Sequence, residues 1–202
     1  MCQEAPLTEL SPRRTEILDA ATSVLAREGL RGLTHRAVDR EAGLPQGSCS
    51  AYYRSRAALQ TALVRYVAAQ VTAEVEQLAD SMLDSWDGVE AAEAVTVMLQ
   101  GWLSQPARQV AHLELSVAAS RDAELAGELT GVHENLIGVA ATVLARRGLS
   151  DAHSLAETIV AALDGVLLAA LKMPAAQRAG FVAHSVRVLI LGATEGGLVD
   201  LK

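Results

Sequence analysis

Residues 34–59 read THRAVDREAGLPQGSCSAYYRSRAAL, and the architecture expected for the chain follows from this stretch. Thr34 is a good helix N-cap, and the residues after it predict a short helix that ends at Gly43. The tetrapeptide LPQG then indicates a turn, and a second, equally short helix is expected from about Ser48 to Tyr53. Two short helices joined by a tight turn that contains glycine are the pattern of a helix-turn-helix unit.

The packing of this unit can be predicted from its spacing. Gly43 is expected to adopt a positive φ, so that the second helix crosses the first at a steep angle. Cys49 and Tyr53 are four residues apart and share one helix face, which we expect to be the packed one. We also expect three apolar residues of the first helix and the turn to face inward: Val38, Ala42 and Leu44. Four small or uncharged residues are left on the outer side: Ser48, Ser50, Ala51 and Tyr52.

Charge is distributed unevenly along the 202 residues, whose formal net charge is −7. Residues 11–65 hold nine arginines and five acids, whereas residues 66–202 hold eight basic residues and seventeen acids. No Asp or Glu occurs from Ala42 to Ala73, and all three tyrosines lie in that segment. Because carboxylates beside a phosphate backbone are repelled, this pattern predicts a module that meets a polyanion, carried on an acidic body.

Composition favours helices throughout. Half of the residues are hydrophobic but only 3% are aromatic, which suits close-packed helices of Ala, Leu and Val better than a β-sandwich. Ser11 and Ser55 are N-cap candidates for the helices before and after the helix-turn-helix unit, and Gly29 is expected to end the helix that precedes it. We expect an all-α chain of about nine helices and no strand, at about 12–29, 34–43, 48–53, 56–85, 89–104, 107–120, 122–147, 152–172 and 175–193. Its predicted parts are a flexible tail (1–10), a helix-turn-helix module that meets the polyanion (11–55) and a helical body (56–202).

The sequence favours a cytoplasmic protein without membrane contact. The first ten residues show no signal peptide. The apolar stretches 159–171 and 186–193 are too short to span a bilayer, and the first contains Asp164. Cys2 and Cys49 form no disulfide or metal pattern. Cys49 beneath a recognition helix could act as a redox sensor, but we expect a small buried hydrophobic residue.

The opening stretch resembles the N-terminal helix-turn-helix of TetR-family (tetracycline-repressor-like) transcriptional regulators. The resemblance covers about residues 11–65 and includes the Ile-Leu-x-Ala-Ala run from Ile17 to Ala21. It continues with Thr34, Ala42-Gly43-Leu44, Gly47, Tyr52-Tyr53, Arg56 and Ala58-Leu59. Two positions depart from the family pattern, because Ser50 stands where many members carry an aromatic residue and Pro45 where many carry Ser. Both bear on which bases are read.

The resemblance implies a set of DNA-binding residues: Thr34, His35, Arg36, Gln46, Gly47, Ser48, Ser50, Ala51, Tyr52 and Arg56. His35 and Arg36 would reach phosphate or a base edge, whereas Tyr52 and Arg56 would hold phosphates together with the amides that open the fourth helix. Four residues would face the major groove: Gln46, Ser48, Ser50 and Ala51. The alternative for Gln46 and Ser48 is that they merely cap the short helix expected from about Ser48 to Tyr53.

The last two long helices are apolar almost all round, which is more than one core requires. Two-fold pairing into a four-helix interface would bury the surplus, and the resemblance implies the same homodimer. The candidate interface residues are Leu163, Val166, Leu167, Ala170, Val186, Leu189 and Ile190. Two recognition helices about 34 Å apart would then read successive major grooves of a palindrome.

Large or polar residues among the apolar helices mark a candidate site for an unknown, largely apolar effector. The candidates are Met98, Trp102, His112, Ser116 and His133, with Trp86, Asn135 and Asp164 as further members. Ordinary core or surface positions are the alternative for each of them.

The function expected from these patterns is that of a ligand-responsive transcriptional regulator, most simply a repressor. A homodimer would bind a palindromic double-stranded DNA operator and be released by a small molecule. One alternative is a small-molecule-binding helical protein whose DNA module no longer functions, and another is a helical enzyme acting through His112 or His133. Neither a nucleophile–base pattern, a glycine-rich phosphate loop nor paired histidine spacing occurs, so no enzyme, cofactor or metal is expected.

Overall fold

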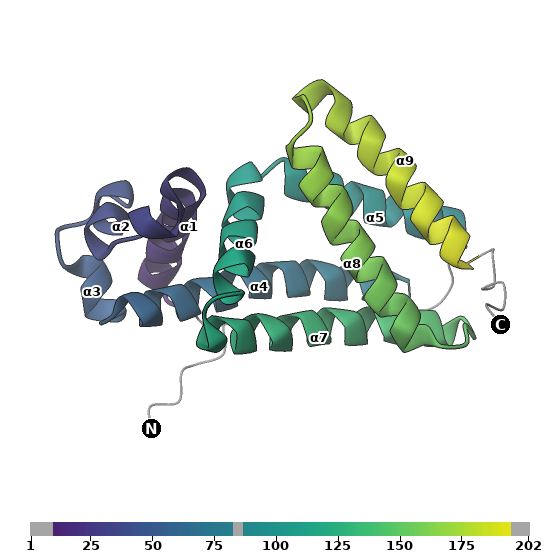
Figure 1. Cartoon of the computed structure of the whole chain (residues 1–202), viewed down its shortest axis with the longest axis horizontal. Coiled ribbons are helices and arrows are strands. Elements are labelled where there is room, and N and C mark those ends of the chain that lie inside the picture. The colour runs from purple at the N-terminus through teal and green to yellow at the C-terminus, as the bar shows by residue number, and fades with distance from the viewer. Residues whose placement is uncertain (1–9, 83–86, 195–202) are drawn as a thin grey trace. The chain divides into compact units, whose positions relative to one another are not determined.

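The structure, a computed structural model, describes residues 10–82 and 87–194. These residues form nine α-helices and include no strand, which confirms the all-α expectation for this part of the chain (Figure 1). The expected tail, apart from Leu10, and Trp86 lie outside the described residues. The helices are α1 (Pro12–Gly32), α2 (His35–Glu41), α3 (Ser48–Tyr52), α4 (Arg56–Ser81), α5 (Gly88–Leu103), α6 (Pro106–Ala119), α7 (Ala123–Arg146), α8 (Ala152–Leu171) and α9 (Ala175–Thr194).

The helices fold into two compact units. Unit 1 contains the described residues up to Val71 together with Ala107–Val132, and so holds α1 to α3, the first part of α4, α6 and the start of α7. Unit 2 contains Thr72–Pro106 and the described residues from His133 onward, which complete α4 and α7 and add α5, α8 and α9. This division by packing does not test the expected functional boundary between residues 55 and 56, which stays a prediction.

Local capping sets the helix starts in unit 1 as the sequence predicts. The Ser11 side chain accepts a hydrogen bond from the Arg14 amide, and Pro12 occupies the first turn of α1. Thr34 Oγ1 accepts from the Ala37 amide at 3.2 Å, and Ser55 Oγ accepts from the Ala58 amide at 3.0 Å. These hydroxyls satisfy amides that have no partner within their helices.

The first helix ends in two steps. Gly29 has a φ of 65°, which interrupts the regular helix at the predicted position, and one further turn runs to Gly32. A positive φ is the conformation that glycine adopts without steric cost.

One hydrophobic core holds unit 1 together. Its fully buried members from α1 are Ile17, Leu18, Ala21, Val24 and Leu25, and α4 adds Leu59 and Leu63. Val38 of α2, Cys49 of α3, Leu115 of α6 and Leu125 of α7 belong to the same cluster. The two short helices are therefore fixed on a scaffold supplied by longer helices.

In unit 2, α9 packs most extensively on α5 and also lies against α8, which it meets at the turn that follows Leu171 (Figure 1). Ala156, Ala170, Val182 and Val186 have no exposed surface. Each of these two helices, α8 and α9, therefore has one apolar face that is buried within unit 2.

The length of α8 corrects one expectation. The bounds of α8 match the predicted helix at 152–172, but by length and composition alone the whole helix is long enough to cross a membrane, whereas the apolar stretch 159–171 was expected to be too short. Only part of α8 is buried within the chain, and Leu168 is 41% exposed. Its apolarity reflects packing on one side and an uncovered apolar face on the other.

Candidate nucleic-acid interface

The turn between α2 and α3 depends on two glycines. Gly43 has a φ of 64°, which confirms the positive value expected from the sequence, and Gly47 has a φ of 97°. The Leu44 amide closes the turn by donating to the backbone carbonyl of Asp39 at 2.8 Å. Because other residues rarely adopt these φ values, both glycines are needed for the crossing of the two helices.

The two faces of α3 divide as the spacing predicts. Cys49 is fully buried and Tyr53 is 8% exposed, so both belong to the core. Ser50, Ala51 and Tyr52 are exposed on the opposite side. A helix face of small and uncharged residues can approach base edges in the major groove without a steric or electrostatic barrier.

The polar residues at the start of α3 do not cap it with their side chains. The N-cap is Gly47, which has no side chain of its own with which to cap the helix. The hydroxyl of Ser48 donates to the Pro45 carbonyl at 2.7 Å, and that of Ser50 donates to the Gly47 carbonyl at 2.9 Å. The geometry thus gives no support to a side-chain N-cap role for Gln46 or Ser48.

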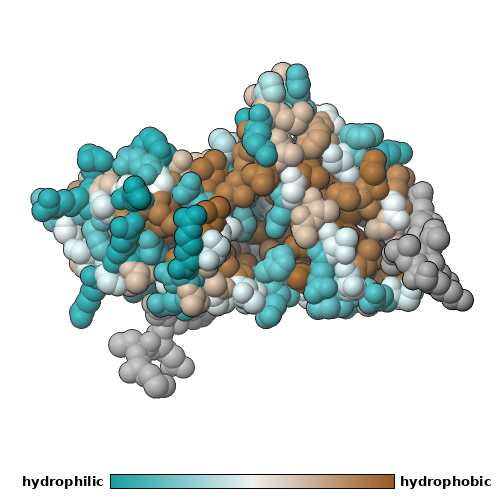
Figure 2. All heavy atoms as spheres, in the orientation of Figure 1, coloured by the Kyte–Doolittle hydropathy of each residue, from teal (hydrophilic) through white to brown (hydrophobic). Residues whose placement is uncertain are grey.

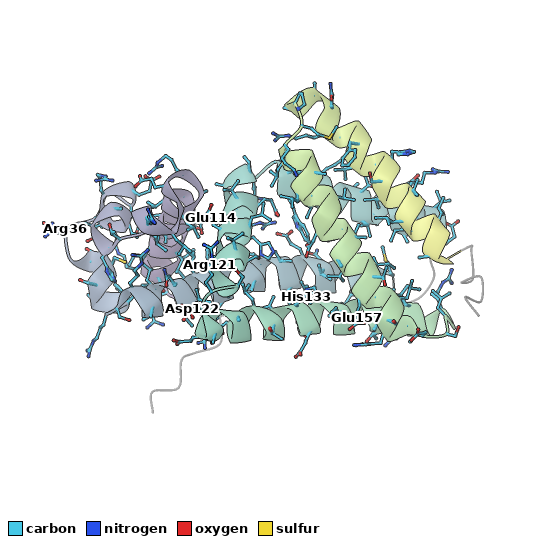
Figure 3. All side chains as sticks on the ribbon, viewed as in Figure 1. Arg36, Glu114, Arg121, Asp122, His133 and Glu157 are labelled. Carbon is cyan, nitrogen blue, oxygen red and sulfur yellow. The ribbon has the colours of Figure 1, made fainter. Side chains whose placement is uncertain are left out.

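Arginines surround this face. Arg36 is exposed and projects outward from α2 (Figure 3). Arg54 and Arg56 are also exposed, and Arg56 Nη2 donates to the Leu30 carbonyl at the end of α1. Since a guanidinium carries five N–H donors, this bond leaves Arg56 able to contact a phosphate as well. Phosphate contacts by such residues orient a protein on the duplex.

Two residues predicted as DNA contacts use their side chains within the fold. Thr34 caps α2 through its hydroxyl. His35 is half-buried, and its Nε2 lies 2.6 Å from the Tyr53 carbonyl oxygen at the end of α3. Whether either also reaches DNA stays a prediction.

The structure adds one residue, Asp39, that the sequence patterns do not single out. Asp39 of α2 is 3% exposed, and its carboxylate accepts hydrogen bonds from two amides at the start of α3. Both donors are across the turn, eight and ten residues along the chain. The signal in the sequence is weak, because local capping rules reach only three or four residues.

The scaffold around α4 is held by polar contacts on two sides. Arg65 binds Glu128 of α7 through two bonds, Nε to Oε2 at 2.8 Å and Nη2 to Oε1 at 2.6 Å. These bonds lower the pKa of the Glu128 carboxyl. On the other side, the Tyr66 hydroxyl donates to Asp19 of α1 at 2.6 Å, and burial together with this bond raises the pKa of Tyr66. Within unit 1, α4 is therefore bonded to both α1 and α7.

The predicted effector residues are divided between the units. Met98 is half-buried on α5, and Trp102, one turn further on, is buried with its indole Nε1 donating to the Glu74 carboxylate. His133 is exposed on α7, in the same unit (Figure 3). His112 and Ser116 belong to unit 1, where the Ser116 hydroxyl donates to the His112 carbonyl at 2.9 Å. Each unit thus holds part of the set, and a shared effector site stays a prediction.

An open apolar groove of about 410 Å³ runs between α8 and α9. Four of its lining residues are Val166, Phe181, Val188 and Leu189. Val188 is 58% exposed, and hydrophobic residues gather on the viewed face of α8 and α9 (Figure 2). Exposed apolar patches of this kind mark interaction surfaces.

Burial divides the residues predicted for the dimer interface, which itself stays a prediction, and the four with the least exposed surface in the single chain are Leu167, Ala170, Val186 and Ile190. Each is at most 7% exposed, so its side chain already packs inside unit 2 and offers almost no surface to a partner. Leu163, Val166 and Leu189 are half-buried and remain candidates. Leu168 and Val188, which are not members of the predicted set, are more exposed. Periodicity identifies apolar faces but does not tell which face the chain itself covers.

The all-α fold with its paired short helices defines a helix-turn-helix protein. Residues 17–63 match the family of bacterial regulatory proteins of the tetR type, and residues 86–196 match the tetracyclin repressor-like C-terminal domain. The second match alone spans more than half of the chain. The chain therefore belongs to the TetR family of transcriptional regulators, which are DNA-binding proteins and not enzymes. Ligand-responsive regulation is the general function of this family.

Solved structures share this fold. A transcriptional regulator from Rhodococcus sp. Rha1 has a TM-score of 0.75 and 19% identity, over 93% of this chain and 99% of that one. The fatty acid degradation regulator FadR from Bacillus halodurans has a TM-score of 0.72 and 18% identity, over 90% and 96% of the two chains. The multidrug binding protein EbrR, in complex with imidazole, has a TM-score of 0.63 and 25% identity, over 89% and 96%. No curated protein sequence matches the chain.

Proposed function

We propose that the chain is a ligand-responsive repressor that binds a palindromic operator as a homodimer and releases it when a small molecule binds. The observation that carries this proposal is the outer face of α3, which is exposed, small and free of carboxylates while its opposite face is buried. A purely structural helix would not need to exclude acids from its solvent side. The arginines around it supply the charge that attracts a phosphate backbone.

In this proposal, residues 11–55 read DNA. Gln46, Ser50 and Ala51 approach base edges, together with Ser48, and the glutamine amide is suited to an adenine edge. Tyr52, Arg36 and Arg56 contact phosphates, which orients the unit on the duplex. Thr34 and Gly47 serve by setting where α2 and α3 begin.

Residues 56–202 carry dimerisation and effector binding in this proposal. Two copies of the groove between α8 and α9 meet across a two-fold axis, so that Val166, Leu168, Val188 and Leu189 become buried. Symmetry of the protein then requires a palindromic operator with half-sites about one helical turn apart.

The proposed effector is small and largely apolar, and Met98 and Trp102 of α5 are the residues that we assign to its contact. Support comes from EbrR, a multidrug binding protein at 25% identity that is also solved in complex with ethidium. The effector must favour the DNA-incompetent conformation by roughly 5.5 kcal/mol to reverse an occupancy of 99:1. We further propose that α4 transmits this preference, since its contacts with α1 and α7 anchor it in unit 1. The regulator would act in the cytoplasm, away from membranes.

The proposal is tested by selecting duplexes from a random-sequence pool with the purified protein at moderate salt. An enriched palindrome, bound in a gel shift and released by a compound from a screen of apolar molecules that includes ethidium, is the expected result. Enrichment of no duplex would refute DNA binding. Ethidium binding without any enriched duplex would instead favour the alternative of a small-molecule-binding protein.

A further inference from the structure

The recognition helix α3 cannot hold its own position. It contains five residues, and its N-cap is a glycine, which has no side chain of its own to accept from the first amides. A helix of this length is unstable in isolation because nucleation costs more than one turn of hydrogen bonds returns. The orientation of α3, which decides which side chains face a base edge, must therefore be set by other elements.

Asp39 holds the beginning of α3. Its Oδ2 accepts from the Gly47 amide and its Oδ1 from the Cys49 amide, both at 2.7 Å. Charge-assisted bonds of this kind are stronger than those between neutral groups, and a negative charge is favourable at a helix N-terminus. Because Asp39 is 3% exposed, water competes little for these bonds.

His35 holds the end of the same helix. Its Nε2 lies 2.6 Å from the carbonyl oxygen of Tyr53, the C-cap of α3. A carbonyl oxygen can only accept, so Nε2 carries the hydrogen. His35 precedes Asp39 by four residues, which places both side chains on one face of α2.

We propose that Asp39 and His35 form a two-point clamp by which α2 positions the recognition helix for operator binding. Tilting α3 against α2 breaks one of the two contacts, so the clamp fixes the angle at which α3 enters the groove. His35 is thereby assigned a positioning role in place of direct DNA contact. The inference rests on the proposed function, because it describes how that same DNA-reading surface is kept in register.

The test compares Asp39→Asn with Asp122→Asn. Asp122 Oδ1 also accepts two amides, those of Glu124 and Leu125 at 3.0 and 3.2 Å, at the start of α7 in the same unit. Each substitution keeps the side-chain size and puts a donor in place of one oxygen. Affinity is measured by fluorescence anisotropy for the duplex selected by the wild-type protein and for an unrelated duplex of equal length, below the unfolding transition of every variant.

For Asp39→Asn we expect roughly tenfold or greater weakening on the selected duplex, because only a fraction of molecules holds α3 correctly. Binding to the unrelated duplex should change little, since arginines dominate it. Asp122→Asn should bind both duplexes as the wild type does. A ratio of selected to unrelated affinity that is unchanged in Asp39→Asn would overturn the clamp, whatever the loss of thermal stability.

A second pair of variants keeps the proposal testable if Asp39→Asn does not fold. His35→Ala removes the donor to Tyr53, whereas His35→Gln offers an amide N–H in its place. The clamp predicts that the ratio of selected to unrelated affinity falls in His35→Ala and at least partly recovers in His35→Gln. Equal values of this ratio in the two variants would contradict the clamp. Failure of the wild-type protein to enrich any duplex would refute the proposed function itself. If the wild-type protein binds its selected duplex and the variants keep the same affinity ratio, only the clamp is refuted.

Discussion

Replacing Val188 by Asp on α9 is expected to separate the homodimer. Val188 lines the groove between α8 and α9 and is 58% exposed in the single chain. In a monomer, an aspartate at this position is solvated and costs little. In a dimer built on the groove, the same carboxylate would be buried against apolar side chains of the partner.

The size of the effect follows from the exposed fraction. Burying a fully exposed aliphatic side chain contributes about 1.5–3 kcal/mol, so the exposed part of Val188 accounts for about 1 kcal/mol. Two-fold symmetry places the residue in the interface twice, and the loss of about 2 kcal/mol raises the dimer dissociation constant about 30-fold. Desolvation of the two carboxylates adds to this, so the figure is a lower bound.

Sedimentation velocity over a series of protein concentrations measures the dissociation constant. The matched control is Val97→Asp, because Val97 lies on α5 in the same unit, is 69% exposed and does not line the groove. At concentrations where Val188→Asp sediments as a monomer, we expect both Val97→Asp and the wild-type protein to remain dimeric. Circular dichroism establishes that both variants keep their helices.

Equal dissociation of the two variants would refute the assignment of the groove as the interface. The exposed apolar face of α8 and α9 would then not be the dimer interface, and the proposed two-fold arrangement of the recognition helices would lose its basis.

Arg36, Glu128 and Cys49 each allow a further test. Arg36→Gln should weaken binding to selected and unrelated duplexes by similar factors, and it should make the slope of log K against log[KCl] shallower by about two per dimer. Arg146→Gln on α7, which is also exposed, should change neither the affinities nor the slope. An unaltered slope for Arg36→Gln would argue against a phosphate contact at Arg36. Arg65 lowers the pKa of Glu128 in the folded protein, so the stability from this pair is present above the ordinary carboxyl pKa of 4.5 and is lost as the pH falls through the lowered value. Urea unfolding at pH 7 and pH 3 should therefore show a smaller loss for Glu128→Gln than for the wild type, and equal losses would exclude the pair as a source of acid sensitivity. Burial, with a smaller contribution from Asp39, raises the pKa of Cys49 to about 11. In a Cys2→Ser background, iodoacetamide at pH 8 should therefore label Cys49 only after the protein is unfolded in urea. Rapid labelling of the folded protein would contradict the buried position of Cys49.

The sequence predicts helix boundaries well where their cause is local. Ser11, Thr34 and Ser55 cap helices through bonds to amides three residues ahead, and such bonds can be read from the residues themselves. Gly43 likewise adopts the positive φ that its place after a short helix requires. The buried face of α3 follows from the four-residue spacing of Cys49 and Tyr53.

Features that depend on tertiary packing could not be predicted in this way. Asp39 finds its partners across a turn, and His35 bonds to a carbonyl 18 residues along the chain. Ala170 and Val186 look as suitable for an interface as Val188 does, but they are fully buried within unit 2. The DNA contacts are implied by the family resemblance and not by residue spacing, because they depend on a partner molecule outside the chain.

Binding of duplex DNA by a doubled, arginine-flanked recognition helix is what the fold and the charge pattern predict. Its most direct test is the affinity of the wild-type protein for its selected duplex as potassium chloride is varied. Arg36, Arg54 and Arg56 from each of two protomers would neutralise about six phosphates, which predicts a slope of log K against log[KCl] near −5. A slope close to zero would contradict the claim, because binding without release of counterions cannot come from this surface.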